Sequence, residues 1–76
     1  MQKLARMSKA KVAEYTQEAG LTSLQAKILQ LRYNDPRELL VVRICDLLKI
    51  SKSMYDRQHR ELVRLCAAYD AEKAQN

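Results

Sequence analysis

Apolar residues recur along the chain at the three- and four-residue spacing of amphipathic helices. For the segment 2–18 and the residue after it, one sector of a helical projection holds Leu4, Ser8, Val12, Tyr15 and Ala19, and the opposite sector holds Lys3, Arg6 and Lys9. The pattern predicts a helix over 2–18 whose basic outer face is either solvated or in contact with phosphate. Gly20 is expected to end this helix, because only glycine enters the left-handed cap without a steric cost.

The next periodic segment begins with a capping signal. Thr22 is followed three positions later by Gln25, the spacing of a capping box, so a second helix is expected to start near Ser23. Its apolar residues form two stripes, one of Leu24, Ile28 and Leu31 and the other of Ala26, Leu29 and Tyr33. Apolar residues on two faces predict a helix at the centre of a small bundle.

Two starts are open for the third helix. Residues 34–38 combine an N-cap candidate with Pro36 at a first helical position and Glu38 in a first turn, which predicts a helix from Pro36 to Leu48. The β-branched run at 41–42 favours the alternative, in which 37–40 is an irregular lead-in and the helix begins near Val41.

A three-residue turn then leads into the last helix, for which Ser51 is the expected cap. Its apolar face is marked by Tyr55, His59, Leu62, Cys66 and Tyr69. The second half of this helix is expected to pack on the first helix or on a second copy of the chain, and the tail 71–76 to fray. The sequence thus predicts an all-α, compact four-helix helix-turn-helix domain over 1–76.

The composition agrees with a small helical domain that binds a polyanion. The chain has 76 residues, one Gly, one Pro and no Trp or Phe, which disfavours a sheet and leaves a marginal core, so a homodimer or a larger complex is an open expectation. The formal net charge of +5 favours an anionic partner. No apolar run is long enough for a membrane span or a signal peptide, which predicts a cytoplasmic protein.

Residues that could carry catalysis are few and scattered. Cys45 and Cys66 are isolated in apolar surroundings, so small core residues are favoured over a disulfide or a metal site. His59 is the only histidine and lies in the apolar stripe, where a structural ring bonded to a backbone or carboxylate group is favoured over a catalytic one. A phosphate-binding glycine loop is excluded because Gly20 is the only glycine. We expect no enzyme activity, no cofactor and no metal.

The last helix carries cationic residues opposite its apolar stripe. A helix that docks by its N-terminal end reads bases with its first residues, and the expected base-reading set is Lys52, Ser53, Asp56 and Arg57. Arg60 and Arg64, one and two turns further on, are expected to contact phosphate. Asp56 is repelled by DNA unless it accepts from cytosine or orients Arg57 or Arg60. The alternative for this face is a solvated charged surface.

From Leu21 to about Leu65 the sequence resembles the fourth conserved region of bacterial sigma factors, the module that reads the upstream promoter element. The matching runs are Leu21-Thr22, the segment Ile28-Leu29-Gln30-Leu31-Arg32-Tyr33, and the segment Ile44-Cys45-Asp46-Leu47-Leu48-Lys49-Ile50-Ser51. Cys45 stands where the family has a small alanine at a helix crossing. The resemblance implies promoter-reading roles for Lys52, Ser53, Asp56 and Arg57.

Two positions and one segment length depart from the pattern. Lys49 replaces the turn glycine, so a non-glycine residue is expected at positive φ, at a cost of about 1 kcal/mol. About two extra residues separate Tyr33 from Ile44, and Asp56 stands where a basic residue is common. The sequence is also similar to the output domains of response regulators.

Several functions are compatible with these features. The chain is similar to small sigma-like transcription regulators of bacteriophages and mobile elements, which implies duplex DNA as a partner and RNA polymerase as a further one. The alternative is a helical interaction or assembly module of a phage or mobile element, such as an adaptor or a DNA-packaging component. RNA binding is a third reading, disfavoured because the four tyrosines all project to apolar faces.

Overall fold

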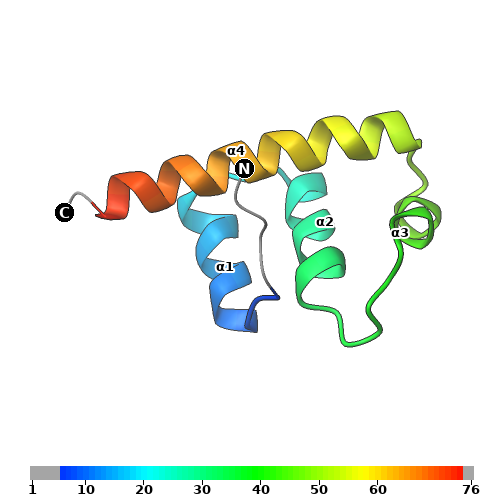
Figure 1. The fold of residues 1–76 in the computed structure, drawn as a ribbon, viewed down its shortest axis with the longest axis horizontal. Helices are drawn as coiled ribbons and strands as arrows, with labels where there is room; N and C mark the ends of the chain where they lie inside the picture. The colour runs from blue at the N-terminus through cyan, green and yellow to red at the C-terminus, as the bar shows by residue number, and fades with distance from the viewer. Residues whose placement is uncertain (1–5, 75–76) are drawn as a thin grey trace.

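The computed structural model describes residues 6–74, which form four α-helices and, within that range, no strand. The helices are α1 (Lys9–Glu18), α2 (Ser23–Tyr33), α3 (Val41–Leu48) and α4 (Lys52–Ala74). Figure 1 shows α4 along one long side of the molecule, with α1 and α2 packed beneath it and α3 below its first turns. The predicted all-α class is confirmed.

The first helix begins at Lys9, so the start predicted at residue 2 is wrong for residues 6–8, and residues 2–5 lie outside the described part of the chain. Ser8 has an extended backbone, and its hydroxyl accepts a hydrogen bond from the Lys11 amide at 3.2 Å. The sequence placed Ser8 on the apolar face of a longer helix, but a serine that acts as N-cap marks the residue after which the helix begins. Just before the cap, the Met7 amide donates to the Tyr33 carbonyl at 2.9 Å and holds the segment against the end of α2.

Arg6 therefore does not belong to a basic helical face. Its guanidinium donates to the carbonyl oxygens of Asp35 at 3.1 Å and Asn34 at 3.5 Å, and so braces the connection between α2 and α3.

Helix α2 has the predicted start and the predicted central place. Thr22 and Gln25 form both hydrogen bonds of the capping box, at 3.0 and 3.2 Å. Ile28 and Leu29 are fully buried, and α2 contacts all three other helices. Gly20, with φ +75°, occupies the left-handed position after α1 as expected.

The connection from α2 to α3 resolves the two predicted starts in favour of Val41; the start at Pro36 is wrong. Asn34 is the C-cap of α2 rather than an N-cap, and its Nδ2 donates to the Met7 carbonyl at 2.9 Å. The Asp35 carboxylate accepts from the backbone and the guanidinium of Arg37, at 2.8 to 2.9 Å, and closes a turn instead of capping a helix. These bonds, together with a φ of 52° at Glu38, keep 35–40 irregular.

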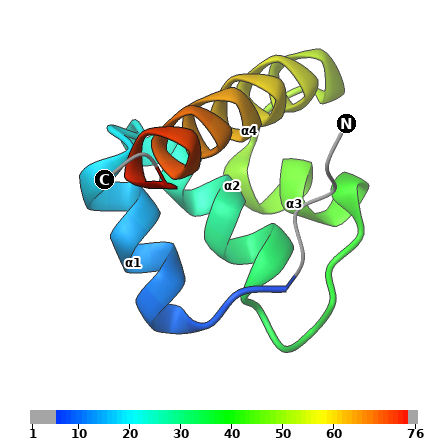
Figure 2. The same cartoon turned by 60° about the vertical axis from the view of Figure 1, so that its left-hand side comes forward.

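Helix α4 is 23 residues long and links the two ends of the domain (Figure 2). Its second half packs on α1 of the same chain: the Tyr15 hydroxyl donates to Asp70 at 2.7 Å, and Glu14 accepts from Tyr69 at 2.5 Å and from Lys73 at 2.8 Å. This interlock holds 71–74 in helix, where the sequence predicted a frayed tail; 75–76 lie outside the described residues.

The core draws on every helix. Its buried members are Tyr15, Ile28, Leu29, Tyr33, Ile44, Cys45, Tyr55, Leu62 and Cys66. Both cysteines are buried free thiols, as predicted.

Candidate nucleic-acid interface

The turn between α3 and α4 fixes the start of the cationic helix. Lys49 adopts the left-handed conformation, with φ 57° and ψ 47°, and the Ile50 amide donates to the Cys45 carbonyl at 3.0 Å. The Ser51 hydroxyl then accepts from the Met54 amide at 3.1 Å and caps α4. The three-residue turn, the positive φ at Lys49 and the Ser51 cap are confirmed.

An aromatic stack supports the first turns of α4 from behind. The ring of His59 stacks on Tyr55 at 5.5 Å and on Tyr33 at 5.9 Å between centroids, and the Tyr33 hydroxyl lies 2.6 Å from His59 Nε2. The predicted structural histidine thus bonds a hydroxyl, and the expected backbone or carboxylate partner is wrong. Burial, and next the charge of Arg32, lower the pKa of His59. A neutral ring between two tyrosines is suited to packing.

A buried amide pair adds a second support. Gln25 is 4% exposed, and its Nε2 donates to Gln58 Oε1 at 3.0 Å, which joins the start of α2 to α4. The same Gln25 closes the capping box, so one side chain sets both the start of α2 and its distance from the cationic helix. Its local role follows from the Thr22 spacing. Its contact with α4 carries no sequence signal, because it joins positions far apart in the chain.

All six residues predicted to contact DNA lie on the exposed side of α4. These are Lys52, Ser53, Asp56, Arg57, Arg60 and Arg64. At 100° per residue they span a sector of about 140°, opposite the buried Tyr55, Leu62 and Cys66. The helix therefore presents one continuous polar face over about its first four turns.

Ion pairs within the helix divide these residues into two kinds. Lys52 Nζ lies 3.1 and 3.0 Å from the Asp56 carboxylate oxygens, so Asp56 pairs with Lys52. The sequence had suggested that Asp56 orients Arg57 or Arg60 instead. Arg64 forms an ion pair with Glu61, through Nε at 3.1 Å and through its terminal nitrogen, which lowers the pKa of Glu61. Exposed pairs of this kind are worth about 0 to 1 kcal/mol and are readily exchanged for phosphate.

Arg57 and Arg60 differ from the paired cations. Within residues 6–74, neither has a carboxylate oxygen within 4.0 Å. With Gln25, Gln58 and Glu61 they line a shallow hollow of about 410 Å³ between α4 and the start of α2. Planar guanidinium groups with unused donors can bond guanine edges or phosphate oxygens in a bidentate manner.

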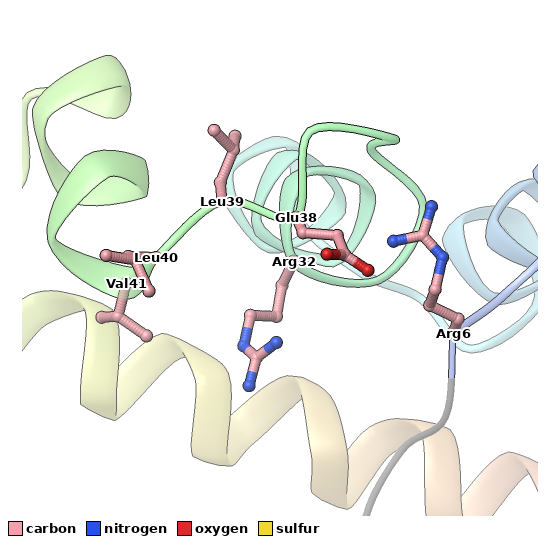
Figure 3. Close-up of a pocket in the computed structure, with 6 residues that line it drawn as sticks. All are labelled: Arg6, Arg32, Glu38, Leu39, Leu40 and Val41. Atoms are coloured by element: carbon pink, nitrogen blue, oxygen red, sulfur yellow. The ribbon is translucent and has the colours of Figure 1, made fainter.

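A second hollow lies beside the connection from α2 to α3 (Figure 3). It has a volume of about 330 Å³ and is lined by Arg6, Arg32, Glu38, Leu39, Leu40 and Val41. In Figure 3 the Arg32 side chain extends toward α4, and Leu39 points to the other side of the connection. The Glu38 carboxylate lines the opening together with the two guanidinium groups, so its charges are of both signs and less favourable to an anion than a uniformly positive lining.

Comparison with protein-family models, with curated proteins and with solved structures finds no significant match to this chain. Among the helices of residues 6–74, none combines the length and the apolar character of a membrane span. Within the same range, no group of three or more His, Cys, Asp or Glu side chains is placed to hold a metal ion.

Proposed function

We propose that this chain is a sequence-specific transcription regulator that binds duplex DNA with α4, in the manner of the sigma factor region that its sequence resembles. The observation that carries the proposal is the exposed polar face of α4, which begins directly after a three-residue turn and is capped by Ser51. In helix-turn-helix proteins the N-terminal end of the second helix enters the major groove.

The division of the cations refines the expected roles. Arg57 is near the helix start and has no carboxylate partner among the described residues, which suits a base contact. Arg64, two turns further on and paired with Glu61, suits a phosphate contact. RNA polymerase remains a proposed partner, and cytoplasmic location follows from the proposed role.

Selection from a random duplex library, followed by competition binding, tests the proposal. Arg57→Ala should lose about 1 to 3 kcal/mol of discrimination between the selected site and a scrambled one, because a bidentate base contact is removed. Arg64→Ala should weaken both duplexes equally and by less. Lys9→Ala, which removes an exposed cation from α1, is the matched control and should change neither.

Salt provides an independent readout. About four to six Lys or Arg contacts should make the affinity fall steeply with salt, with a logarithmic slope of about −0.9 for each phosphate contacted. An affinity that is flat across salt, or an Arg57→Ala variant that discriminates as well as the parent, would falsify the docking geometry.

A second function, the interaction or assembly module, is favoured by one feature. Leu40 and Val42 are 73 and 65% exposed at the start of α3. Recovery of the tagged chain from its host with protein and without DNA would support this alternative. RNA binding is less well supported, because Tyr15, Tyr33 and Tyr55 are buried and Tyr69 is bonded to Glu14, which leaves no exposed tyrosine among residues 6–74 for base stacking.

A further inference from the structure

The outer face of α3 combines exposed apolar residues with two charges of opposite sign. Leu47 is 43% exposed, and Val42 is more exposed still. Arg43 and Asp46, which lie between them on the same face, are also exposed. Within the described residues, neither has an oppositely charged group within 4.0 Å.

The inner face of the same helix is fully used by the monomer. Ile44 and Cys45 are buried, and Val41 and Leu48 pack against the core. Helical geometry turns 42, 43, 46 and 47 to the side opposite these residues. Half of a strongly apolar helix is therefore left without a partner in the single chain.

We infer that this outer face of α3 is the contact surface of a homodimer, in which the two copies of α3 lie antiparallel about a two-fold axis. An axis that passes midway between Arg43 and Asp46 sets Arg43 of each copy level with Asp46 of the other, so two ion pairs form across the interface. The same axis is midway between Val42 and Leu47, which flank the ion pairs with apolar contacts from both copies.

The order of the charges favours a second copy over another kind of partner. A uniformly acidic surface would match Arg43 and repel Asp46, and a uniformly basic one would do the reverse. Only a partner that carries both charges in the opposite order matches both, and an antiparallel copy of this helix has that order by symmetry.

The size of the face predicts a weak dimer. With eight residues, α3 is about 12 Å long. Such a surface is smaller than the roughly 800 Å² per partner of a standard interface. The dimer is therefore expected to form at high protein concentration. Its test does not depend on the proposed DNA binding, because association is measured without DNA.

Sedimentation equilibrium of the full chain across a wide concentration range is the test. The apparent mass should rise from that of one chain toward that of two. Arg43→Asp places two carboxylates opposite each other, and Asp46→Arg places two guanidinium groups opposite each other, so each variant alone should associate at least about tenfold more weakly. An equimolar mixture of the two variants should associate again, because each then supplies the charge that the other lacks.

Lys27→Asp, an exposed change on α2, is the matched control and should leave association as in the parent. Circular dichroism checks that every variant keeps its helices, and Arg43→Gln with Asp46→Asn replaces any variant that does not. A parent chain that stays monomeric at its highest soluble concentration overturns the inference. So does association that both charge changes leave intact, or a mixture that associates no better than its components.

Discussion

Replacing Lys49 with glycine should stabilise the protein. Lys49 is the residue on which the turn before α4 depends, and its φ of 57° and ψ of 47° lie in the left-handed region. A β-carbon in that region crowds the following carbonyl oxygen, whereas glycine has no such contact. The amide of residue 49, which donates to the end of α3, is retained by the change.

The expected gain is small but measurable. The left-handed conformation costs an L-residue about 1 to 2 kcal/mol. Glycine also loses more conformational entropy on folding, because its unfolded state is freer, and this offsets roughly 0.5 to 1 kcal/mol of the relieved strain. The free energy of unfolding should therefore rise by about 0.5 to 1 kcal/mol, which raises Tm by roughly 2 to 8 °C in a domain of this size.

Thermal unfolding followed by circular dichroism measures the change, and two variants isolate its cause. Lys49→Ala removes the same charge but keeps a β-carbon, so it should remain close to the parent. Gly20→Ala is the reverse experiment: φ at Gly20 is +75°, and an added methyl group would have no atom within 4 Å, so the expected loss of about 1 kcal/mol comes from the backbone alone. If Lys49→Gly is no more stable than Lys49→Ala, the turn does not hold the strain described.

Three further predictions concern the interlock of α1 with α4 and the two thiols. Bonds from Lys73 and Tyr69 hold the pKa of Glu14 at about 2, below its ordinary 4.5, so this carboxylate stabilises the fold above pH 4.5 and its contribution is lost as the pH falls toward 2. Urea unfolding at several pH values should show a flatter acid limb in Glu14→Gln, and an unchanged limb would contradict the interlock. Cys66 is fully buried and its pKa is raised to about 11, mainly by burial, so a thiol reagent should label it only in urea; rapid labelling of the folded chain would refute this. Cys45→Ala should cost about 1 kcal/mol and Cys45→Leu roughly 1 to 3 kcal/mol by overpacking the helix crossing, as read from chemical denaturation, and the opposite order would show that the site has room to spare.

Local signals in the sequence were enough for the starts of α2 and α4. The capping pair of Thr22 with Gln25 and the cap at Ser51 are formed by neighbours within three residues, and such contacts do not depend on the rest of the fold. The exposed sector of α4 followed from its period for the same reason. The pairing of Lys52 with Asp56 follows the four-residue rule and was within reach of the sequence as well.

The start of α1 was missed although its Ser8 cap is local, and the sequence left the start of α3 open between Pro36 and Val41 because distant partners decide it. The segment 34–38 reads as a helix start, but the Asn34 side chain bonds the Met7 carbonyl and so belongs to the end of α2. The contacts of Gln25 with Gln58 and of Tyr33 with His59 also join separate helices. No pattern along one helix encodes such pairs, so the supports behind the cationic face could be described only from the tertiary structure.

The length and rigidity of α4 limit how the domain can move. The helix contains neither glycine nor proline from Lys52 to Ala74, and at 1.5 Å per residue its 23 residues make a stiff rod of about 34 Å. Its N-terminal end carries the polar face with Arg57, and its C-terminal end is hydrogen-bonded to α1 through Tyr69 and Lys73. The rod has no joint at which the two ends could swing relative to each other. A partner that binds the N-terminal end of α4 therefore also fixes the position and orientation of α1. The domain should bind as one rigid body, without closing around its partner.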